Sequence, residues 1–386
     1  MKCVSALSTL TNTEAAIQEV VERAAALMGG EPGDLALVFA SPHHAAGMAK
    51  LTEAIRAHQL GRHVLGCTGE SIVADGQEIE GAAALGLWSA RLPDVDLKPF
   101  RLTFVDGEFS GMPTAGGSSL LLLGDPFSFP ADQFLLRANG ELPGLRVVGG
   151  MASGANAPGQ NRLILDGETF QDGAVAISLE GALVLRTIVS QGCRPIGRPY
   201  IVTKAEQNLI RELGRRPALE VLGELFATLP PGDQHRVQHG LHVGRVINEY
   251  QESFQRGDFL VHNVLGADEV GGIAISDRAK VGQTVQFHVR DEETADEDLR
   301  ALLEKDRDLH PDANVRGALL FTCNGRGTRL FSEPHHDVTV LQNVFNAIPT
   351  AGFFAMGELG PVGGQNFVHG YTASIVLFEE PGSPSA

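Results

Sequence analysis

Closely spaced cysteines and an excess of basic residues are both missing from this sequence. The four cysteines lie far apart and form no CxxC motif, which excludes a disulfide framework and a local zinc knuckle. Lysine and arginine total 30 against 47 aspartate and glutamate, so the formal net charge is -17. That charge would repel a phosphate backbone, and no basic stripe offsets it. We therefore expect no nucleic-acid partner.

Long apolar segments are missing too. The longest, LLLLG at Leu120–Gly124, falls far short of the ~20 residues that span a bilayer. The N-terminal segment lacks the apolar core and the small-residue cleavage site of a signal peptide. We expect a soluble, cytoplasmic protein without a membrane partner.

Short apolar runs alternate with amphipathic stretches, which is typical of α/β proteins. The 386 residues, 43% of them hydrophobic, are enough for two or three folded units. The spacing predicts a helix over Asn12–Met28, which ends at a pair of glycines. The pairs Thr203/Glu206 and Thr294/Glu297 match the capping box and predict two further helix starts.

One order of elements occurs three times: strand, helix, strand ending in a glycine turn, polar loop, strand. The segments from first strand to glycine turn are Leu35–Gly66, Ser119–Gly149 and Ala318–Gly357. The third is longer because CNGRGTRLFSEP is inserted after its first strand. Any α/β protein repeats strands and helices, but the recurrent glycine turn favours an internal repeat. The sequence therefore predicts an α/β fold with mixed sheets built from repeated strand-helix-strand-strand units.

The ordered motifs of the chain resemble those of FIST-domain proteins. The matching stretches are VLGCTGE, GLRVVGGMASG, QGCRPIG, VTKAEQNLIRELGRRPALEVL, GDFLVHNVLGADEVGGIAI, ALLFTCNGRG and GELGPVGGQNFVHGYTASIVLF. The resemblance implies two FIST domains packed together, an N-terminal one over 1–216 and a C-terminal one over 217–386, with a disordered tail of about seven residues. His262 departs from the family pattern, in which we expect an arginine, and this argues against an anion contact there.

The resemblance also implies a function. FIST domains are proposed to be sensory modules that bind small ligands such as amino acids, in bacterial signalling proteins and in a eukaryotic F-box protein. Some relatives are similar to haem-dependent nitric oxide sensors, so a haem-based gas sensor is the alternative. No kinase, cyclase or chemoreceptor segment is visible in the sequence. We therefore expect the signal to pass to a separate protein such as a kinase or cyclase.

The glycine turns end equivalent strands, so we expect them to gather at one edge of the molecule, around a pocket between the two domains. The candidate ligand-binding residues come from these turns and from the connector before the third unit: Cys67, Thr68, Glu70, Arg194, Arg326, Glu358, Asn366 and His369. Arg194 or Arg326 would bind a carboxylate through paired hydrogen bonds, and Glu358 an amine. In the alternative interpretation the glycines only make tight turns, and Arg326 pairs with a nearby acid.

Other site chemistries find less support. The glycines of GELGPVGG lack the spacing of a dinucleotide fingerprint and precede a strand. His369 is the candidate haem ligand, and the histidines of SPHH and EPHH would form a metal site only if two repeats faced each other. Cys67 and Cys323 are candidate hydrolase nucleophiles, but no flanking signature completes a triad. We therefore predict no cofactor, no metal site and no complete catalytic constellation.

Overall fold

The computed structural model describes residues 1–113, 119–254 and 257–381. The chain forms two compact units, one from Met1–Val189 with Arg300–Ala386 and the other from Ser190–Leu299. The larger unit therefore combines the two ends of the chain, and the domain boundary expected at 216/217 lies within the smaller unit. The expected C-terminal tail falls largely outside the described residues.

Three repeats of one pattern build the larger unit, as the sequence predicts. Each has a strand, a helix, a parallel second strand, a β-hairpin and a returning antiparallel strand. The first repeat contains β2 (Leu35–Ala40), α2 (Met48–Ala57), β3 (His63–Thr68), β4 (Ile72–Ala74), β5 (Gln77–Ile79) and β6 (Leu85–Arg91). The second contains β9 (Ser119–Gly124), α3 (Ala131–Glu141), β10 (Arg146–Met151), β11 (Leu163–Leu165), β12 (Glu168–Phe170) and β13 (Ala174–Gly181). The third contains β22 (Asn314–Cys323), α7 (His336–Phe345), β23 (Thr350–Ala355), β24 (Glu358–Val362), β25 (Gln365–His369) and β26 (Ala373–Glu380).

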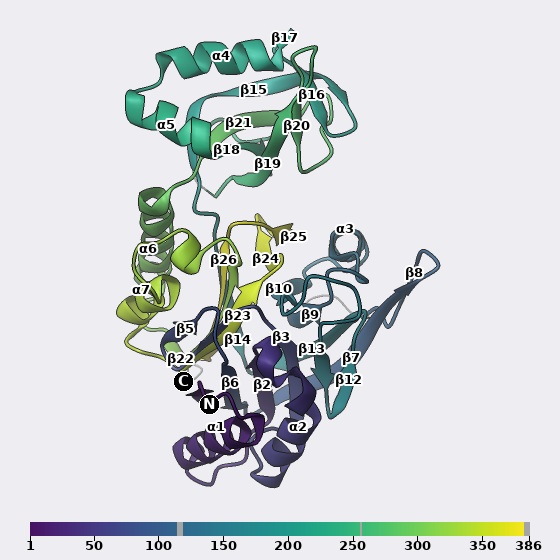
Figure 1. Ribbon diagram of the computed structural model, residues 1–386, viewed down its shortest axis with the longest axis vertical. Helices are drawn as coiled ribbons and strands as arrows, with labels where there is room; N and C mark the ends of the chain where they lie inside the picture. The colour runs from purple at the N-terminus through teal and green to yellow at the C-terminus, as the bar shows by residue number, and fades with distance from the viewer. Residues whose placement is uncertain (114–118, 255–256, 382–386) are drawn as a thin grey trace, which may run out of the picture. The chain divides into compact units, whose positions relative to one another are not determined.

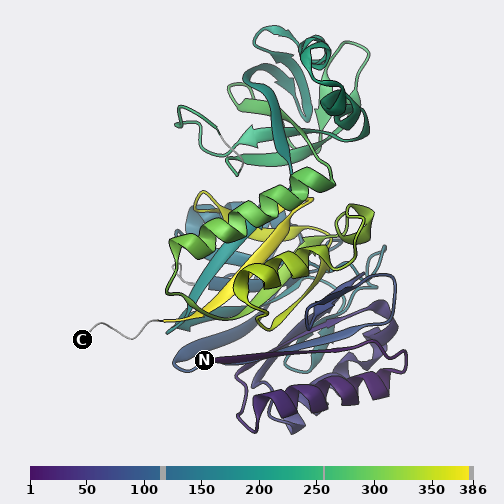
Figure 2. The same ribbon diagram turned by 90° about the vertical axis from the view of Figure 1, so that its left-hand side faces the viewer.

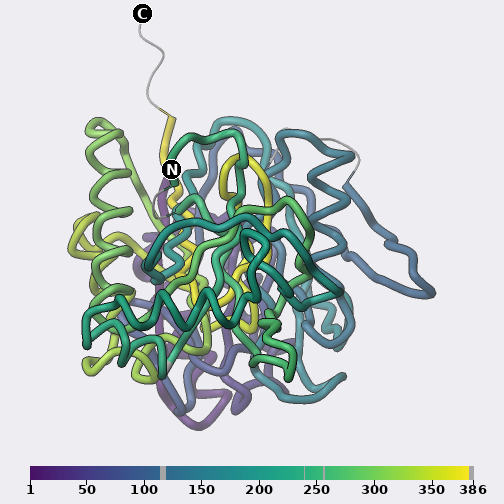
Figure 3. Tube along the Cα trace, turned by 90° about the horizontal axis from the view of Figure 1, so that it is seen from above, coloured from purple at the N-terminus to yellow at the C-terminus, as the bar shows by residue number. Residues whose placement is uncertain are grey.

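Each repeat forms its own sheet, which has one further strand beside the returning strand. β1 (Lys2–Ser8) joins the first sheet, β7 (Val95–Val105) the second and β14 (Val184–Ser190) the third. β7 also pairs with β8 (Glu108–Ser110), and this hairpin projects from the larger unit (Figure 1, Figure 3).

The hairpins of the repeats are exchanged in a ring among the three sheets. The β4–β5 hairpin of the first repeat pairs with β23 of the third, and the β11–β12 hairpin of the second pairs with β3 of the first. The β24–β25 hairpin of the third repeat pairs with β10 of the second. Because another repeat completes each sheet, the repeats depend on one another, and residues from the two ends of the chain meet.

The same kind of turn closes all three hairpins. Asp75–Gly76, Asp166–Gly167 and Gly363–Gly364 form two-residue loops with positive φ at both positions, which is the pattern of type I′ turns. Aspartate and glycine tolerate this left-handed conformation better than most residues. The glycine-rich stretch GELGPVGGQNFVHG is therefore an ordered hairpin.

One glycine in each repeat allows the second strand to approach the first. Gly66, Gly149 and Gly352 occupy equivalent positions in β3, β10 and β23. A Cβ atom there would lie 2.4, 1.9 and 1.8 Å from a carbonyl oxygen of the preceding parallel strand, so a side chain does not fit without backbone movement. The sequence predicts that Gly66, Gly149 and Gly357 form the turns that end the second strands, but Gly66 and Gly149 lie within β3 and β10, and only Gly357 lies in such a turn, between β23 and β24.

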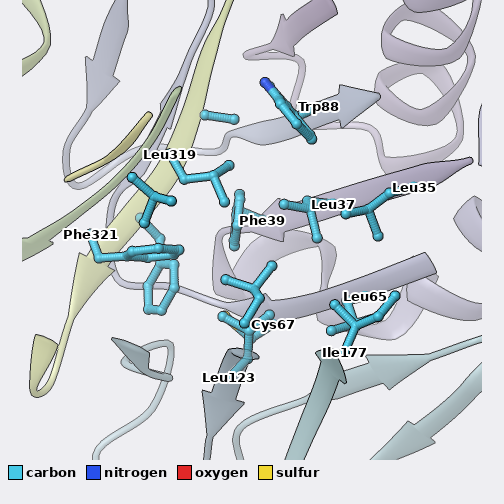
Figure 4. Close-up of a cluster of buried hydrophobic side chains, with 14 of the residues drawn as sticks. Leu35, Leu37, Phe39, Leu65, Cys67, Trp88, Leu123, Ile177, Leu319 and Phe321 are labelled. Atoms are coloured by element: carbon cyan, nitrogen blue, oxygen red, sulfur yellow. The ribbon is translucent and has the colours of Figure 1, made fainter. Parts of the chain in front are cut away.

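The main hydrophobic core of the larger unit lies where the three sheets face one another. Leu37 and Cys67 of the first repeat, Leu123 and Ile177 of the second and Phe321 of the third belong to it (Figure 4). Helices cover the outer faces of the sheets, with α1 (Thr13–Met28) and α2 on the first, α3 on the second and α7 on the third. Figure 2 shows α1 in purple and α7 in yellow-green on their sheets. The helix predicted from residue 12 is confirmed as α1.

The smaller unit is a closed antiparallel barrel with two helices. Its strands are, in spatial order, β15 (Arg194–Glu206), β21 (Thr284–Val289), β18 (Leu241–Val246), β19 (Phe259–Ala267), β20 (Ile273–Ile275), β16 (Leu209–Leu213) and β17 (Arg216–Pro217). β15 pairs with β16 as well as with β21, which closes the barrel. The helices are α4 (Ala218–Thr228) and α5 (Pro231–His239), and α6 (Glu292–Leu309) crosses the division between the units.

The helix start predicted at Thr203 is wrong. Thr203 and Glu206 lie in β15, and the chain turns at Gln207, with φ 53°, into β16. Val202 and Ile210 are buried in the barrel core, so burial across the two strands overrides the local capping pattern.

The other helix start, predicted at Thr294, lies about one turn too late in the sequence. α6 begins at Glu292, and Asp291 rather than Thr294 caps it. Asp291 Oδ1 accepts from the Thr294 N–H at 2.8 Å, and Thr294 Oγ1 accepts from the Asp291 N–H at 3.0 Å. This is the reciprocal arrangement of a capping box.

Candidate ligand-binding site

The turns after the second strands of the repeats meet at the carboxyl ends of those strands. Backbone hydrogen bonds join the ends of these strands and the turns that follow them, repeat to repeat: Met151 N–H to the Gly357 carbonyl (2.8 Å), Phe354 N–H to the Ser71 carbonyl (2.9 Å) and Ser153 N–H to the Thr68 carbonyl (3.2 Å). The expectation that the turns gather at one edge is confirmed. The carboxyl ends of parallel strands are also where α/β proteins commonly bind ligands.

The first turn contributes one charged side chain to this edge. Cys67 is fully buried in the core, and burial raises the pKa of its thiol well above the usual value, which disfavours a thiolate nucleophile. Thr68 is also buried, and its Oγ1 accepts from the Arg162 N–H at 3.0 Å. Glu70 is the charged residue, and its Oε2 lies 3.2 Å from Nη1 of Arg329.

The insertion in the third repeat forms a loop over residues 324–335, between β22 and α7. Side chains of the first repeat hold it in place. Glu70 pairs with Arg329, and Glu80 accepts from the Thr328 N–H at 2.9 Å and from its hydroxyl at 2.8 Å. We call residues 324–335 the insertion loop.

A buried ion pair connects the insertion loop to the first turn of α7. Nε and Nη2 of Arg326 each donate to Asp337 at 2.7 Å, and the two side chains are 0% and 1% exposed. The Thr322 hydroxyl donates to the same carboxylate at 2.6 Å, and His336 Nδ1 lies 2.9 Å from it. Burial opposes ionisation of Asp337, but Arg326 and these hydrogen bonds hold its pKa well below the usual range. Arg326 therefore pairs with a nearby acid, as the alternative interpretation states.

Two further buried carboxyl groups interact electrostatically with Arg326. Glu358 Oε2 accepts from the Thr372 hydroxyl at 2.7 Å, and Glu78 Oε1 accepts from the Val338 N–H at 2.8 Å. Within the described ranges, Oε1 of Glu358 and Oε2 of Glu78 have no hydrogen-bond partner. Burial raises the pKa of each carboxyl to about 8. Both groups are therefore mostly neutral acids at pH 7, and each interacts electrostatically with Arg326.

Asn366 and His369 hold the β24–β25 hairpin in place. The Asn366 side chain donates to the Leu145 carbonyl at 2.9 Å and accepts from the Val147 N–H at 2.8 Å. Nε2 of His369 lies 2.9 Å from the Gly360 carbonyl oxygen, and the residue is 4% exposed. His369 therefore contacts the backbone of its own hairpin.

Arg194 belongs to the smaller unit, where its Nη2 lies 2.6 Å from Oδ1 of Asp233. His262 lies in the same unit, with Nε2 3.2 Å from Oδ2 of Asp277, and burial lowers its pKa to about 4. Both arginines predicted to bind a ligand carboxylate therefore have an aspartate partner within the protein.

The two histidine pairs have separate partners. His43 Nδ1 lies 3.2 Å from Ser41 Oγ, and His335 Nδ1 accepts from the Glu78 N–H at 2.9 Å. Among the residues that the structure describes, no three His, Cys, Asp or Glu side chains are grouped so as to hold a metal ion. No helix in the described parts of the chain is both long and apolar enough to cross a bilayer.

Sequence reasoning misses Glu78, Asp337 and Arg329. Asp337 has a recognisable signal, because it stands on the same helical stripe as Leu341 and Phe345, four and eight residues later, where an apolar side chain is expected. Glu78 has none, because its burial depends on which sheet receives the exchanged hairpin. Arg329 lies in the insertion, where no periodic pattern gives its direction.

The fold and the site together define a protein of three hairpin-exchanged repeats with a buried acidic cluster at their strand ends. The FIST N domain matches residues 34–216 and the FIST C domain residues 218–361, so the chain belongs to the FIST family. FIST domains are associated with sensory and signalling roles.

Mycobacterial proteins are among the relatives of this chain. An uncharacterized protein of Mycobacterium tuberculosis is 42% identical over 359 residues, which cover 91% of this chain and 92% of that protein. An uncharacterized protein of Mycobacterium bovis is 39% identical over 377 residues, 96% of this chain and 97% of that protein. The similarity therefore extends over both FIST domains.

Proposed function

We propose that this FIST protein is a sensor that binds a small ligand, an amino acid or a related metabolite, around Arg326 and Glu358. The site combines Glu70 and Glu78, from the FIST N region, with residues of the FIST C region. Ligand occupancy would change how firmly the insertion loop is held against the first repeat. The protein would act in the cytoplasm and pass its signal to a separate protein such as a kinase or cyclase.

The unused oxygen of the buried Glu358 carboxyl carries this proposal. A buried polar atom without a partner costs about 1–3 kcal/mol, and proteins retain such atoms mainly where they have a role. Glu358 lies at the strand ends where the three turns meet, and it interacts with Arg326. A ligand N–H group would satisfy its free oxygen.

A thermal-shift screen with amino acids and related metabolites tests the proposal. A ligand at 100 times its dissociation constant should stabilise the wild type by ~2.7 kcal/mol. Glu358→Gln should lose this effect, whereas Glu168→Gln, at an exposed position of the β11–β12 hairpin, should keep it. Stabilisation that survives Glu358→Gln would locate the ligand elsewhere, and a screen without any stabilising compound would favour a scaffold role.

A further inference from the structure

We infer that this site recognises an ammonium group, and that its ligand is a cationic amine bound by Glu358 and Glu78 rather than an anion bound by arginine. The inference rests on the proposed function and narrows its ligand class. It concerns the larger unit only, where all the groups involved lie.

The arginines near the site already have carboxylate partners within the protein. Arg326 uses Nε and Nη2 on Asp337, and Arg329 pairs with Glu70. A ligand carboxylate that took Arg326 would leave Asp337 charged and 1% exposed without its counter-ion. Uncompensated buried charges are strongly disfavoured, so Nε and Nη2 of Arg326 are not available to an anionic ligand.

The polar atoms that remain without a partner are acceptors suited to a cation. Oε1 of Glu358 and Oε2 of Glu78 are carboxyl oxygens without a partner in the described residues. Carboxylate oxygens accept strong hydrogen bonds from ammonium groups. The charged groups that act on these two acids are Arg326, Asp337 and Glu80, and Thr372 and Val338 donate hydrogen bonds to their other oxygens. Arg326 and Asp337 cancel in charge, so the pair does not oppose a cation.

Binding of the cation should be coupled to the release of a proton from the site. As the ammonium group docks, one carboxyl group loses its proton to solvent, and the new carboxylate neutralises the ligand. Because both acids stay largely protonated up to about pH 8, amine affinity should increase as pH rises towards 8. The increase should approach ~10-fold per pH unit and level off above pH 8.

The experiment measures thermal stabilisation of the full chain by ethanolamine, putrescine, acetate and glycine at matched ionic strength and at pH 6, 7 and 8. We expect the two amines to stabilise the wild type, with apparent affinity ~10-fold higher at pH 7 than at pH 6. Acetate should have no effect. Glu358→Gln should abolish the amine effect, Glu78→Gln should weaken it, and the exposed control Glu168→Gln should retain it.

Two results would overturn the inference. If acetate stabilises the wild type and the simple amines do not, the ligand is recognised through its carboxylate. A loss of that effect in Glu358→Gln would then refute the ligand class while supporting the proposed site. If the amines stabilise Glu358→Gln as much as the wild type, they bind elsewhere and the inference is wrong.

Discussion

Removing the Arg326 guanidinium should strongly destabilise the larger unit. In Arg326→Met the side chain keeps its apolar stem, but Asp337 loses both 2.7 Å hydrogen bonds and its counter-ion while it stays buried. Breaking a buried pair from one side costs about 3–5 kcal/mol. Asp337 retains Thr322 and His336 as partners, so we expect the lower end, about 3 kcal/mol.

The double variant Arg326→Met/Asp337→Leu tests whether the destabilisation comes from leaving one buried charge without its partner. With both charges replaced by apolar groups of similar size, no uncompensated charge remains, and much of the stability should return. We expect the double variant to lie within about 1–2 kcal/mol of the wild type, because the Thr322 hydroxyl still loses its acceptor.

Urea unfolding followed by tryptophan fluorescence measures this directly. Trp88 is the single tryptophan, it is fully buried, and its ring lies 4.8 Å from that of Phe378, so its emission reports the larger unit. A loss below about 1 kcal/mol in Arg326→Met would refute the reasoning. A double variant as unstable as the single one would refute it as well.

The buried glutamates, a strand glycine and the cysteines of the larger unit can be tested as well. Glu78 and Glu358 have pKa values of about 8 in the folded protein, whereas the usual pKa of a glutamate is 4.5. Between these two pH values the folded protein therefore binds more protons than the unfolded chain. Stability should therefore fall as pH rises from about 4.5 to 8, by up to ~1.4 kcal/mol per unit for each acid, and urea titrations should show a flatter profile for Glu78→Gln/Glu358→Gln. Gly352→Ala should cost at least about 3 kcal/mol, because its Cβ would lie 1.8 Å from the Leu320 carbonyl oxygen, while Gly370→Ala, with no atom within 4 Å, should stay within about 0.5 kcal/mol in the same assay. Iodoacetamide should label the partly exposed Cys323 before the buried Cys67, as peptide mass spectrometry would show, and the reverse order would contradict the burial of Cys67.

The repeat architecture of the larger unit can be predicted from sequence because its elements are long and regular. β2, α2 and β3, together with their counterparts, carry the alternation that sequence reasoning detects. The exchanged hairpins cannot be predicted in this way. A three-residue strand such as β4 carries too short a pattern to indicate its partner sheet, and packing around the common core decides which sheet receives it.

The candidate site is predictable in part for a related reason. Arg326 and Glu358 stand at strand ends, which the pattern identifies, and the structure brings them within electrostatic range of each other. Their partners are set by tertiary contacts, so Asp337 and Glu78 are missed. Asn366 and Arg194 contain the expected chemical groups but use them on Leu145 and Asp233.

A crystal structure of the chain with the compound that stabilises it most would show where the ligand binds. We predict a ligand nitrogen within about 2.7–3.2 Å of a Glu358 carboxylate oxygen, with the Arg326–Asp337 pair intact beside it. A ligand seated in the barrel of the smaller unit, with Glu358 still lacking a partner, would contradict it.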